Sequence, residues 1–441
     1  MLWIVFGLIA VTLYFAHSMT FELRASDNRV AGMEAEQAIE GARRYFTCVL
    51  SNVTEVGVLP DPQTYQNEAV PVGNAHFWVI GRGDEQANEP TQMHFGLTDE
   101  ASKININIAS SNLLINLPRM TPDIVANILT WRSTNTTTTS TGAESDTYER
   151  MTQPYTAKNA PFETVDELRL ISEMDETTLY GEDANLNGVL DPNENDGDAA
   201  PPSDNMDGKL DPGLLEYCTV YTIEPTNFVS TNSSGVVTNM ARINVANLAT
   251  PGSADSTALR NLLTQDFGSS VAGQVIGRVG GQTMTSPLAF YYASQLTTAQ
   301  FSQIEPALRG TNITGLINVN TASLAVLSCL WTNGQASQVF AYRQSNTNMA
   351  ATQGQTSVWI TQVLSQSDVL SVAPYLTGFG YQFTADIAAL GHDGRGYRRT
   401  RFIYDTSQGT PIILHRQDLS HLGWALGKAV RDKYLLAKST P

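Results

Sequence analysis

The sequence predicts an α+β protein: a long amino-terminal helix leads into an antiparallel sheet, and a large α-helical domain is inserted within that sheet. Three observations carry this prediction. Residues 1–50 read as one continuous helix, strand-like runs occur both before residue 103 and after residue 378, and the segment between them repeats a helical motif. At 441 residues, the chain is long enough for two or three domains.

The amino-terminal helix is the first element. Residues 1–21 carry no charge, and roughly 20 apolar residues in a helix cross the ~30 Å hydrocarbon layer of a bilayer. A secretory signal would need a basic start, yet no Lys or Arg precedes Arg24; a processed signal or a misplaced start is the alternative. Residues 22–50 continue without proline. Apolar small residues recur every three or four positions there, at Ala31, Ala35, Ala38 and Ala42. We therefore expect residues 1–21 to span a membrane and residues 22–50 to pack on a soluble domain.

The sheet is predicted from two distant parts of the chain. Residues 51–103 form its first part, because two strand-like runs follow the proline break at residues 60–62. Residues 378–441 form its second part, where apolar residues alternate again and a glycine-rich turn covers residues 391–396. The predicted strands are residues 76–80, 93–97, 380–388, 398–404 and 411–415.

Between these parts, residues 104–377 are predicted to be an inserted, mainly α-helical domain of repeated helix-hairpin-helix-like modules. Residues 104–117 and 316–330 share an Ile-Asn start, a capping serine and an apolar helix, and residues 242–248 are a fainter echo. In both full copies the second helix ends in an aromatic residue and an arginine, at Arg132 and Arg343. Such repetition favours stacked helical units over one enzyme core. A Thr-rich run at residues 134–141 predicts a loop.

Residues 183–216 carry two copies of a calcium-loop pattern. The first fits the spacing of a twelve-residue loop, with Gly188 at the sharp turn; its predicted ligands are Asp183, Asn185, Asn187, the Val189 carbonyl, Asp191 and Glu194. The second copy opens at Ser203 or Asp204 and continues twenty residues after the first, with Asn205, Asp207, Asp211 and, two residues late, Glu216. Asp196 and Asp198 lie between the copies and could serve either ion. We predict one or two structural Ca²⁺ ions; a solvated acidic loop is the alternative.

Composition restricts the partners. The chain has 26 basic and 43 acidic residues, a formal charge of −17, which repels duplex DNA and anionic membrane surfaces and attracts divalent cations. The cysteines, Cys48, Cys218 and Cys329, lack C-x-x-C spacing, so one disulfide plus a free thiol and three buried thiols both stay open.

No catalytic motif is present. The six histidines are scattered, and there is no H-E-x-x-H, G-x-S-x-G or phosphate-binding loop pattern. The arginines at 395, 398, 399 and 401 are interpreted as an exposed strand face or a partner contact. We predict a protein that is not an enzyme; a secreted calcium-dependent hydrolase with unrecognised catalytic groups is a competing class.

The order of these features resembles the K-type minor pseudopilins of the type II secretion system (general secretion pathway protein K family). The matching residues are the apolar helix, the Ile-Asn runs at 104–107 and 317–323, the calcium stretch from Asp183, and the closing residues 398–399 and 415–423. The resemblance implies a pilin-type sheet with a large helical insertion and bound calcium. Val5 stands where most pilins carry Glu, and the K-type family is similar in lacking that acid. No basic leader ending in Gly precedes Met1, so mature numbering and a truncated start both stay open.

This resemblance also implies a location and partners. It places the chain as a single-pass protein in the bacterial inner membrane, with its bulk in the periplasm. There it would cap the tip of a short pseudopilus together with the I- and J-type minor pseudopilins. Secreted cargo and the outer-membrane channel are further candidate contacts.

A second resemblance is to the helix-hairpin-helix of membrane-anchored DNA receptors of competence or type IV pilus systems. That module grips phosphate through backbone N–H groups in a glycine hairpin. Residues 118–121 lack those glycines and the chain is acidic, so we expect no nucleic-acid partner.

Overall fold

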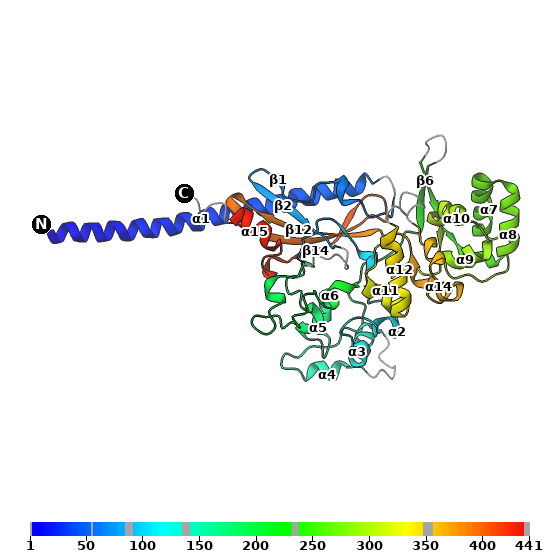
Figure 1. Ribbon diagram of the computed structural model, residues 1–441, viewed down its shortest axis with the longest axis horizontal. Coiled ribbons are helices and arrows are strands. Elements are labelled where there is room, and N and C mark those ends of the chain that lie inside the picture. Colours follow the sequence, from blue (N-terminus) through cyan, green and yellow to red (C-terminus); the bar gives the residue numbers. More distant parts are fainter. Residues whose placement is uncertain are drawn as a thin grey trace.

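The computed structural model describes residues 2–53, 56–83, 91–134, 142–231, 237–346 and 356–435. Residues 135–141 of the predicted Thr-rich loop lie outside this set. A long helix, an antiparallel sheet and a body of shorter helices make up the described chain, as Figure 1 shows. The predicted combination of a long amino-terminal helix, an antiparallel sheet and further helices is confirmed.

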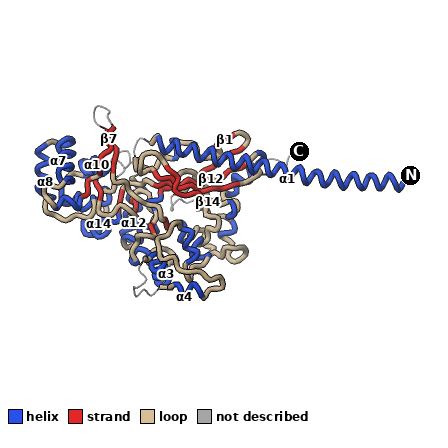
Figure 2. The backbone as a smooth tube through the Cα atoms, turned by 180° about the vertical axis from the view of Figure 1, so that it is seen from behind, coloured by secondary structure: helices blue, strands red, loops and turns tan. Residues whose placement is uncertain are grey.

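Helix α1 (Leu2–Ser51) is continuous, as predicted. Its amino-terminal half projects from the rest of the molecule (Figures 1 and 2), and among the described residues it is the one helix long and apolar enough to cross a membrane. Its second half lies on the sheet, where Ala31, Ala35, Ala38 and Ala42 have no exposed surface. Small side chains at this spacing let the helix backbone approach the strands closely.

The sheet is built from strands of two distant segments, residues 70–99 and 382–418. Its order is β1-β2-β12-β13-β14, with β3 also paired to β12, and every pair is antiparallel. The central strand β12 pairs with β2, so the sheet cannot be completed until the inserted domain has been made. The strands are β1 (Val70–Val72), β2 (Ala75–Ile80), β3 (Thr98–Asp99), β12 (Gln382–Leu390), β13 (Arg398–Asp405) and β14 (Ile412–Asp418).

One predicted strand differs. Residues 93–97 contribute a single bridge, between Phe95 and Ile80, and pairing resumes only at β3. Met93 and Phe95 pack on the side of the sheet away from α1, whereas Leu97 is buried in the cluster beneath α1. The side chains of this segment therefore change from one face of the sheet to the other between Phe95 and Leu97, before the chain pairs with β12 as β3.

The inserted domain consists of three units, each closed by a short parallel pairing. β4 (Ile104–Asn105) pairs with β5 (Cys218–Thr219), β8 (Ile243–Asn244) with β9 (Leu308–Arg309), and β10 (Ile317–Asn318) with β11 (Leu376–Thr377). Each unit thus begins with the Ile-Asn pair seen in the sequence. The fainter sequence echo at residues 242–248 opens a full unit of its own.

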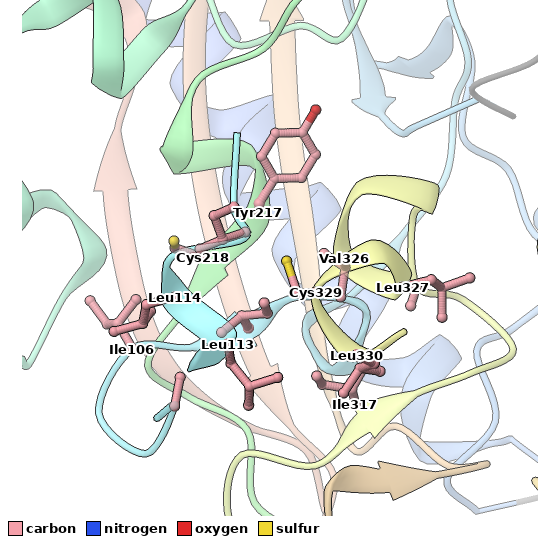
Figure 3. Packing of buried hydrophobic residues seen from close by; sticks show 14 of the residues in the cluster. Ile106, Leu113, Leu114, Tyr217, Cys218, Ile317, Val326, Leu327, Cys329 and Leu330 are labelled. Carbon is pink, nitrogen blue, oxygen red and sulfur yellow. The ribbon is translucent and has the colours of Figure 1, made fainter. Parts of the chain in front are cut away.

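Helices fill each unit, and a hairpin of β6 (Asn227–Thr231) and β7 (Val237–Ala241) separates the first two. The first and third units share one hydrophobic core, to which Leu114 and Leu327 belong (Figure 3), whereas the second has its own. Cys218 and Cys329 lie in the shared core as free thiols, and Cys48 is exposed. The helices are α2 (Ser111–Leu114), α3 (Pro122–Arg132), α4 (Ser145–Glu149), α5 (Glu176–Tyr180) and α6 (Leu214–Tyr217) in the first unit; α7 (Ala254–Phe267), α8 (Ser269–Val279), α9 (Pro287–Ser294) and α10 (Thr298–Ile304) in the second; and α11 (Leu324–Leu330), α12 (Asn333–Ser345) and α14 (Gln366–Val372) in the third.

Equivalent arginines brace the first and third units. Arg343 Nη1 donates to the carbonyls of Val319 (3.0 Å) and Ala322 (2.7 Å). Arg132 donates to the corresponding carbonyls of Ile106 and Ala109. The aromatic-arginine ending of the sequence repeat therefore marks the residue that ties the second helix back to the start of its unit.

We expect Arg343→Ala to lower the free energy of unfolding by about 3 kcal/mol, because two buried carbonyls lose a charged donor. Urea denaturation of the full chain in detergent measures this. Arg260→Ala, at an exposed position of α7, is the matched control and should change stability by less than about 0.5 kcal/mol. Equal stability of the two variants would contradict the bracing role.

A histidine holds α1 against the turn between β12 and β13. His392, in the 3₁₀ helix η9 (His392–Gly394), places Nδ1 2.6 Å from Glu34 Oε2 and Nε2 3.0 Å from Asp27 Oδ1. Arg395 also pairs with Asp27. Glu34 and Asp27 raise the pKa of His392, and the His392 backbone N–H and ring lower the pKa of Glu34.

These directions fix the pH dependence. A raised histidine pKa contributes stability that is fully present below the unfolded value of about 6.5 and is lost as the pH rises through the folded value. We expect the free energy of unfolding to fall from pH 6.5 toward pH 8, as measured by urea titration, and the fall to be smaller in His392→Gln, which retains only the contributions of other groups with raised pKa values. His421→Gln, on the exposed surface, is the control; a fall of the same size in His392→Gln and in the unsubstituted chain would contradict the role of His392.

Candidate calcium site

The first acidic loop has the turns of a calcium loop. Asp183 Oδ1 and Oδ2 accept hydrogen bonds from the backbone N–H groups of Asn187 (2.9 Å) and Gly188 (2.8 Å). The side-chain oxygens of Asn185 and Asn187 each accept from the backbone two residues on. Gly188 has φ of 73°, which only glycine adopts without strain, so the sharp turn forms where the spacing predicted it.

The carboxylates of this loop converge. Asp191 Oδ2 accepts from the amide groups of Asn185 (2.7 Å) and Asn187 (3.0 Å). Glu194 closes the loop, because its two oxygens accept from the backbone N–H groups of Ala184 (3.1 Å) and Asp191 (3.0 Å). Five of the predicted ligands of the first copy, Asp183, Asn185, Asn187, Asp191 and Glu194, are therefore linked within one hydrogen-bonded loop.

Two of these carboxyl groups are buried. Asp183 and Glu194 are each 1% exposed. Burial, together with the negative charge of Asp183, raises the pKa of Glu194 to about 8, and burial also raises the pKa of Asp183. No Lys or Arg pairs with Glu194 in the described part of the chain. Such a pair of carboxylates is costly to ionise unless a cation compensates it.

The loop is also fixed to the sheet. Arg399, which is fully buried, binds Asp386 of β12 through Nε (2.8 Å) and donates to the carbonyls of Asn185 and Leu186. Arg401 pairs with the same carboxylate, and the two arginines lower the pKa of Asp386 against the effect of its burial. The interpretation of this arginine group as an exposed face is therefore wrong for Arg399: alternation selects a face of the strand, and the inserted domain covers that face.

The second loop repeats the first, with φ of 74° at Gly208. The side-chain oxygens of Asn205 and Asp207 accept from the backbone two residues on, and the Asn205 amide donates to Asp211 (3.1 Å). The closing carboxylate is Glu182, whose oxygens accept from the backbone N–H groups of Asn205 (3.3 Å) and Asp211 (3.1 Å). Glu182 therefore closes the second loop by accepting two backbone hydrogen bonds, as Glu194 does in the first loop.

Glu182 was missed because it precedes its loop, outside any twelve-residue window. Asn195 was also missed; it accepts from the Gly208 N–H (3.2 Å), as Asp183 does in the first loop. The sequence signal for Glu182 was its position next to Asp183, directly before the first repeat. Asp183 belongs to the first loop and Glu182 to the second.

The remaining predicted residues lie elsewhere. Glu216 is not brought to the second loop: it forms a two-point ion pair with Arg82, with Nε 2.6 Å from Oε1. Burial alone would raise the pKa of Glu216, but Arg82 lowers it. Asp196 caps a turn by accepting from the Ala200 N–H (3.1 Å), and Asp198 is exposed.

The donor set fits a hard cation such as Ca²⁺. It offers carboxylate, amide and carbonyl oxygens without sulfur or imidazole. Among the described residues, no three His, Cys, Asp or Glu side chains are grouped as metal ligands, so the asparagines and the Val189 carbonyl would have to complete the shell. Asn185 and Asn187 point their NH₂ groups at Asp191, and binding an ion there would require the amides to turn their oxygens inward. The bound ion would neutralise the buried carboxylates and stabilise the loops.

A comparison with protein families gives a match for the segment directly before the calcium loops. Residues 99–180 match the family model described as "Type II secretion system (T2SS), protein K". The predicted resemblance to protein K is confirmed over these residues. The match to protein K runs from β3 to the end of α5 and stops before Asp183. No curated protein sequence matches the chain.

A solved structure is also similar to the chain. It is the GspK-GspI-GspJ complex from the type 2 secretion system of enterotoxigenic Escherichia coli. The alignment has 10% sequence identity and a TM-score of 0.41, and it covers 91% of this chain and 99% of that one.

The two loops can be tested separately by calcium-dependent melting of the full chain in detergent. Asp183→Ala with Glu194→Ala should remove most of the rise in melting temperature that calcium produces over a chelator, and Glu182→Ala should remove only the part due to the second loop. Glu216→Ala should lower the melting temperature equally with and without calcium, because the partly buried Arg82 loses its ion-pair partner. Identical melting of the unsubstituted chain in calcium and in chelator would contradict calcium binding.

Proposed function

We propose that this chain is a structural, non-enzymatic K-type minor pseudopilin, which caps the tip of a type II secretion pseudopilus. The single observation that carries the proposal is the match of residues 99–180 to protein K of this system. The match covers the end of β3 and most of the first inserted unit, on a chain whose projecting apolar helix leads into a sheet.

The projecting helix supports membrane anchoring. The apolar side chains of residues 3–21 are exposed, as they would be in lipid or in a helix bundle. Val30 (42% exposed) and Met33 (52% exposed) continue this apolar surface beyond the membrane-spanning part. We assign this surface to the helices of the I- and J-type minor pseudopilins, the kind of partners named in the GspK-GspI-GspJ complex. The head would then lie in the periplasm.

The shape supports capping. The second and third units lie at the end of the molecule opposite to the amino terminus (Figures 1 and 2). A subunit added above this one in a helical assembly would have to occupy the same space. The chain would thus act by position, and the inserted units would form repeated helix-hairpin-helix-like modules stabilised by one or two Ca²⁺ ions.

The DNA-receptor alternative has little support. In the segment of the first unit that would grip phosphate, Arg119 has a positive φ of 61° and glycines are absent. Elsewhere in that unit, the N–H groups of Gly188 and Gly197 donate to the carboxylates of Asp183 and Asp204, which repel phosphate.

Partner binding can be tested by co-expressing the tagged full chain with the I- and J-type pseudopilins of the same organism. We expect all three to co-purify from detergent, because helix packing and head contacts both survive extraction. Val30→Asp with Met33→Asp should reduce partner recovery at least about tenfold, since charges would enter an apolar helix contact.

The control for this experiment is Ile223→Asp with Met240→Asp, which alters two exposed apolar residues away from α1. It should leave recovery unchanged. If the unsubstituted chain recovers neither partner while remaining folded in the membrane, the pseudopilin assignment is wrong.

A further inference from the structure

Charge is distributed unevenly along this acidic chain. Residues 378–441 carry nine Lys and Arg against five Asp and Glu, whereas the whole chain carries 26 against 43. Three of these basic residues, Lys428, Arg431 and Lys433, lie exposed on one short helix, α15 (Gly427–Leu435).

Helix α15 is fixed at the end of the sheet from which α1 leaves. Tyr434 packs edge-on against Trp78 of β2, with ring centroids 5.2 Å apart, and also contacts His76. His76 lies opposite Leu390 in the sheet register, directly before the turn in which His392 holds α1. Figure 1 shows α15 beside α1 where α1 leaves the sheet, and both helices contact η9.

This position is close to the expected membrane surface. His392 contacts Asp27, which follows the last residue of the apolar segment, Phe21, by six residues. Six residues of helix rise about 9 Å, and the headgroup layer extends about 5–8 Å beyond the hydrocarbon. The end of the sheet therefore lies within about one Debye length of the headgroups, where charges are not screened from one another.

The acidic residues at this end are mostly compensated. Asp27 pairs with Arg395 and His392, Glu36 pairs with Arg398, and Asp432 pairs with Lys428. In the described chain, Arg24, Arg29 and Arg431 are exposed and have no ion pair, and Lys433 has only a contact with the Tyr434 ring. Glu22, Asp393 and Asp418 are exposed acids at this end that oppose them.

We propose that Arg24, Arg29, Arg431 and Lys433 form a basic collar that binds anionic phospholipid headgroups while α1 spans the bilayer. This inference rests on the proposed membrane anchoring of α1. The collar would be a second contact with the membrane, in addition to the spanning part of α1, and the total charge of −17 does not predict it. The collar would hold the head upright on the bilayer until the subunit joins an assembly.

The experiment places a fluorophore on α15 of the full chain. Ala429→Cys, at an exposed position, is labelled in a Cys48→Ser background, because the other two thiols are buried. The chain is inserted into vesicles of phosphatidylcholine, or of phosphatidylcholine with about one-third phosphatidylglycerol, each carrying a headgroup quencher. Calcium is present in every arm, because the first loop lies beside this region: Asn185 Nδ2 donates to the Trp424 carbonyl (3.2 Å).

We expect stronger quenching in the anionic vesicles and its loss in about 1 M salt. Arg431→Gln with Lys433→Gln should reduce the equilibrium constant for headgroup contact by about 25-fold, at about fivefold for each charge. Arg431→Lys should retain contact. Arg150→Gln with Arg260→Gln, which removes the same charge from exposed positions directly after α4 and on α7, is the matched control and should behave as the unsubstituted chain.

Quenching that is equal in both vesicles, or unchanged in Arg431→Gln with Lys433→Gln, would overturn the collar. Release by inorganic phosphate beyond that caused by sodium chloride of equal ionic strength would instead indicate a phosphate site and would also overturn it. A chain that alkaline carbonate extracts from both vesicles lacks the anchor itself, which refutes the membrane part of the proposed function and not the collar alone.

Discussion

The buried ion pair between Arg399 and Asp386 is the interaction on which the arrangement of the head depends. A guanidinium with no exposed surface is tolerated only when its donors are all used, and one carboxylate cannot use them. The remaining donors bind the carbonyls of Asn185 and Leu186, which are presented only when the first acidic loop is folded. The sheet and the loop therefore require each other, and anything that orders the loop, such as a bound cation, also stabilises the sheet.

The same principle recurs where the inserted units meet the sheet and one another. Glu100 accepts from Thr384 of β12 and from Thr219 at the end of the first unit, so it joins that unit to the sheet. Glu224 pairs with Arg242, at the start of the second unit, and accepts from Thr377, at the end of the third. Buried carboxylates with specific partners make these junctions directional, whereas apolar contacts alone would permit several ways of stacking the units.

Patterns that repeat over many residues could be predicted from the sequence, and isolated contacts could not. The 50-residue helix, the alternating strands at both ends and the Ile-Asn repeat all leave periodic signals, and the structure contains each of them except the strand predicted at residues 93–97. The parallel pairings that close the units, such as Ile243–Asn244 with Leu308–Arg309, involve two residues a side and leave no period. Glu182 lies outside the loop it closes, and Arg399 alternates like an exposed residue, because neither spacing nor alternation records what another domain covers.

Placement of charge matters more than its total in this chain, since charges act over about 8 Å at physiological ionic strength. The acidic loops explain much of the formal charge of −17, and the first of them touches Trp424, three residues before α15. A cation bound between Asp183 and Glu194 would add positive charge beside the basic helix and leave the end of the sheet next to α1 more positive. Calcium in the loops and lipid at α15 would then favour each other by linkage, because each lowers the electrostatic cost of the other. A chain that is acidic overall could in this way present a cationic surface to the membrane it is anchored in.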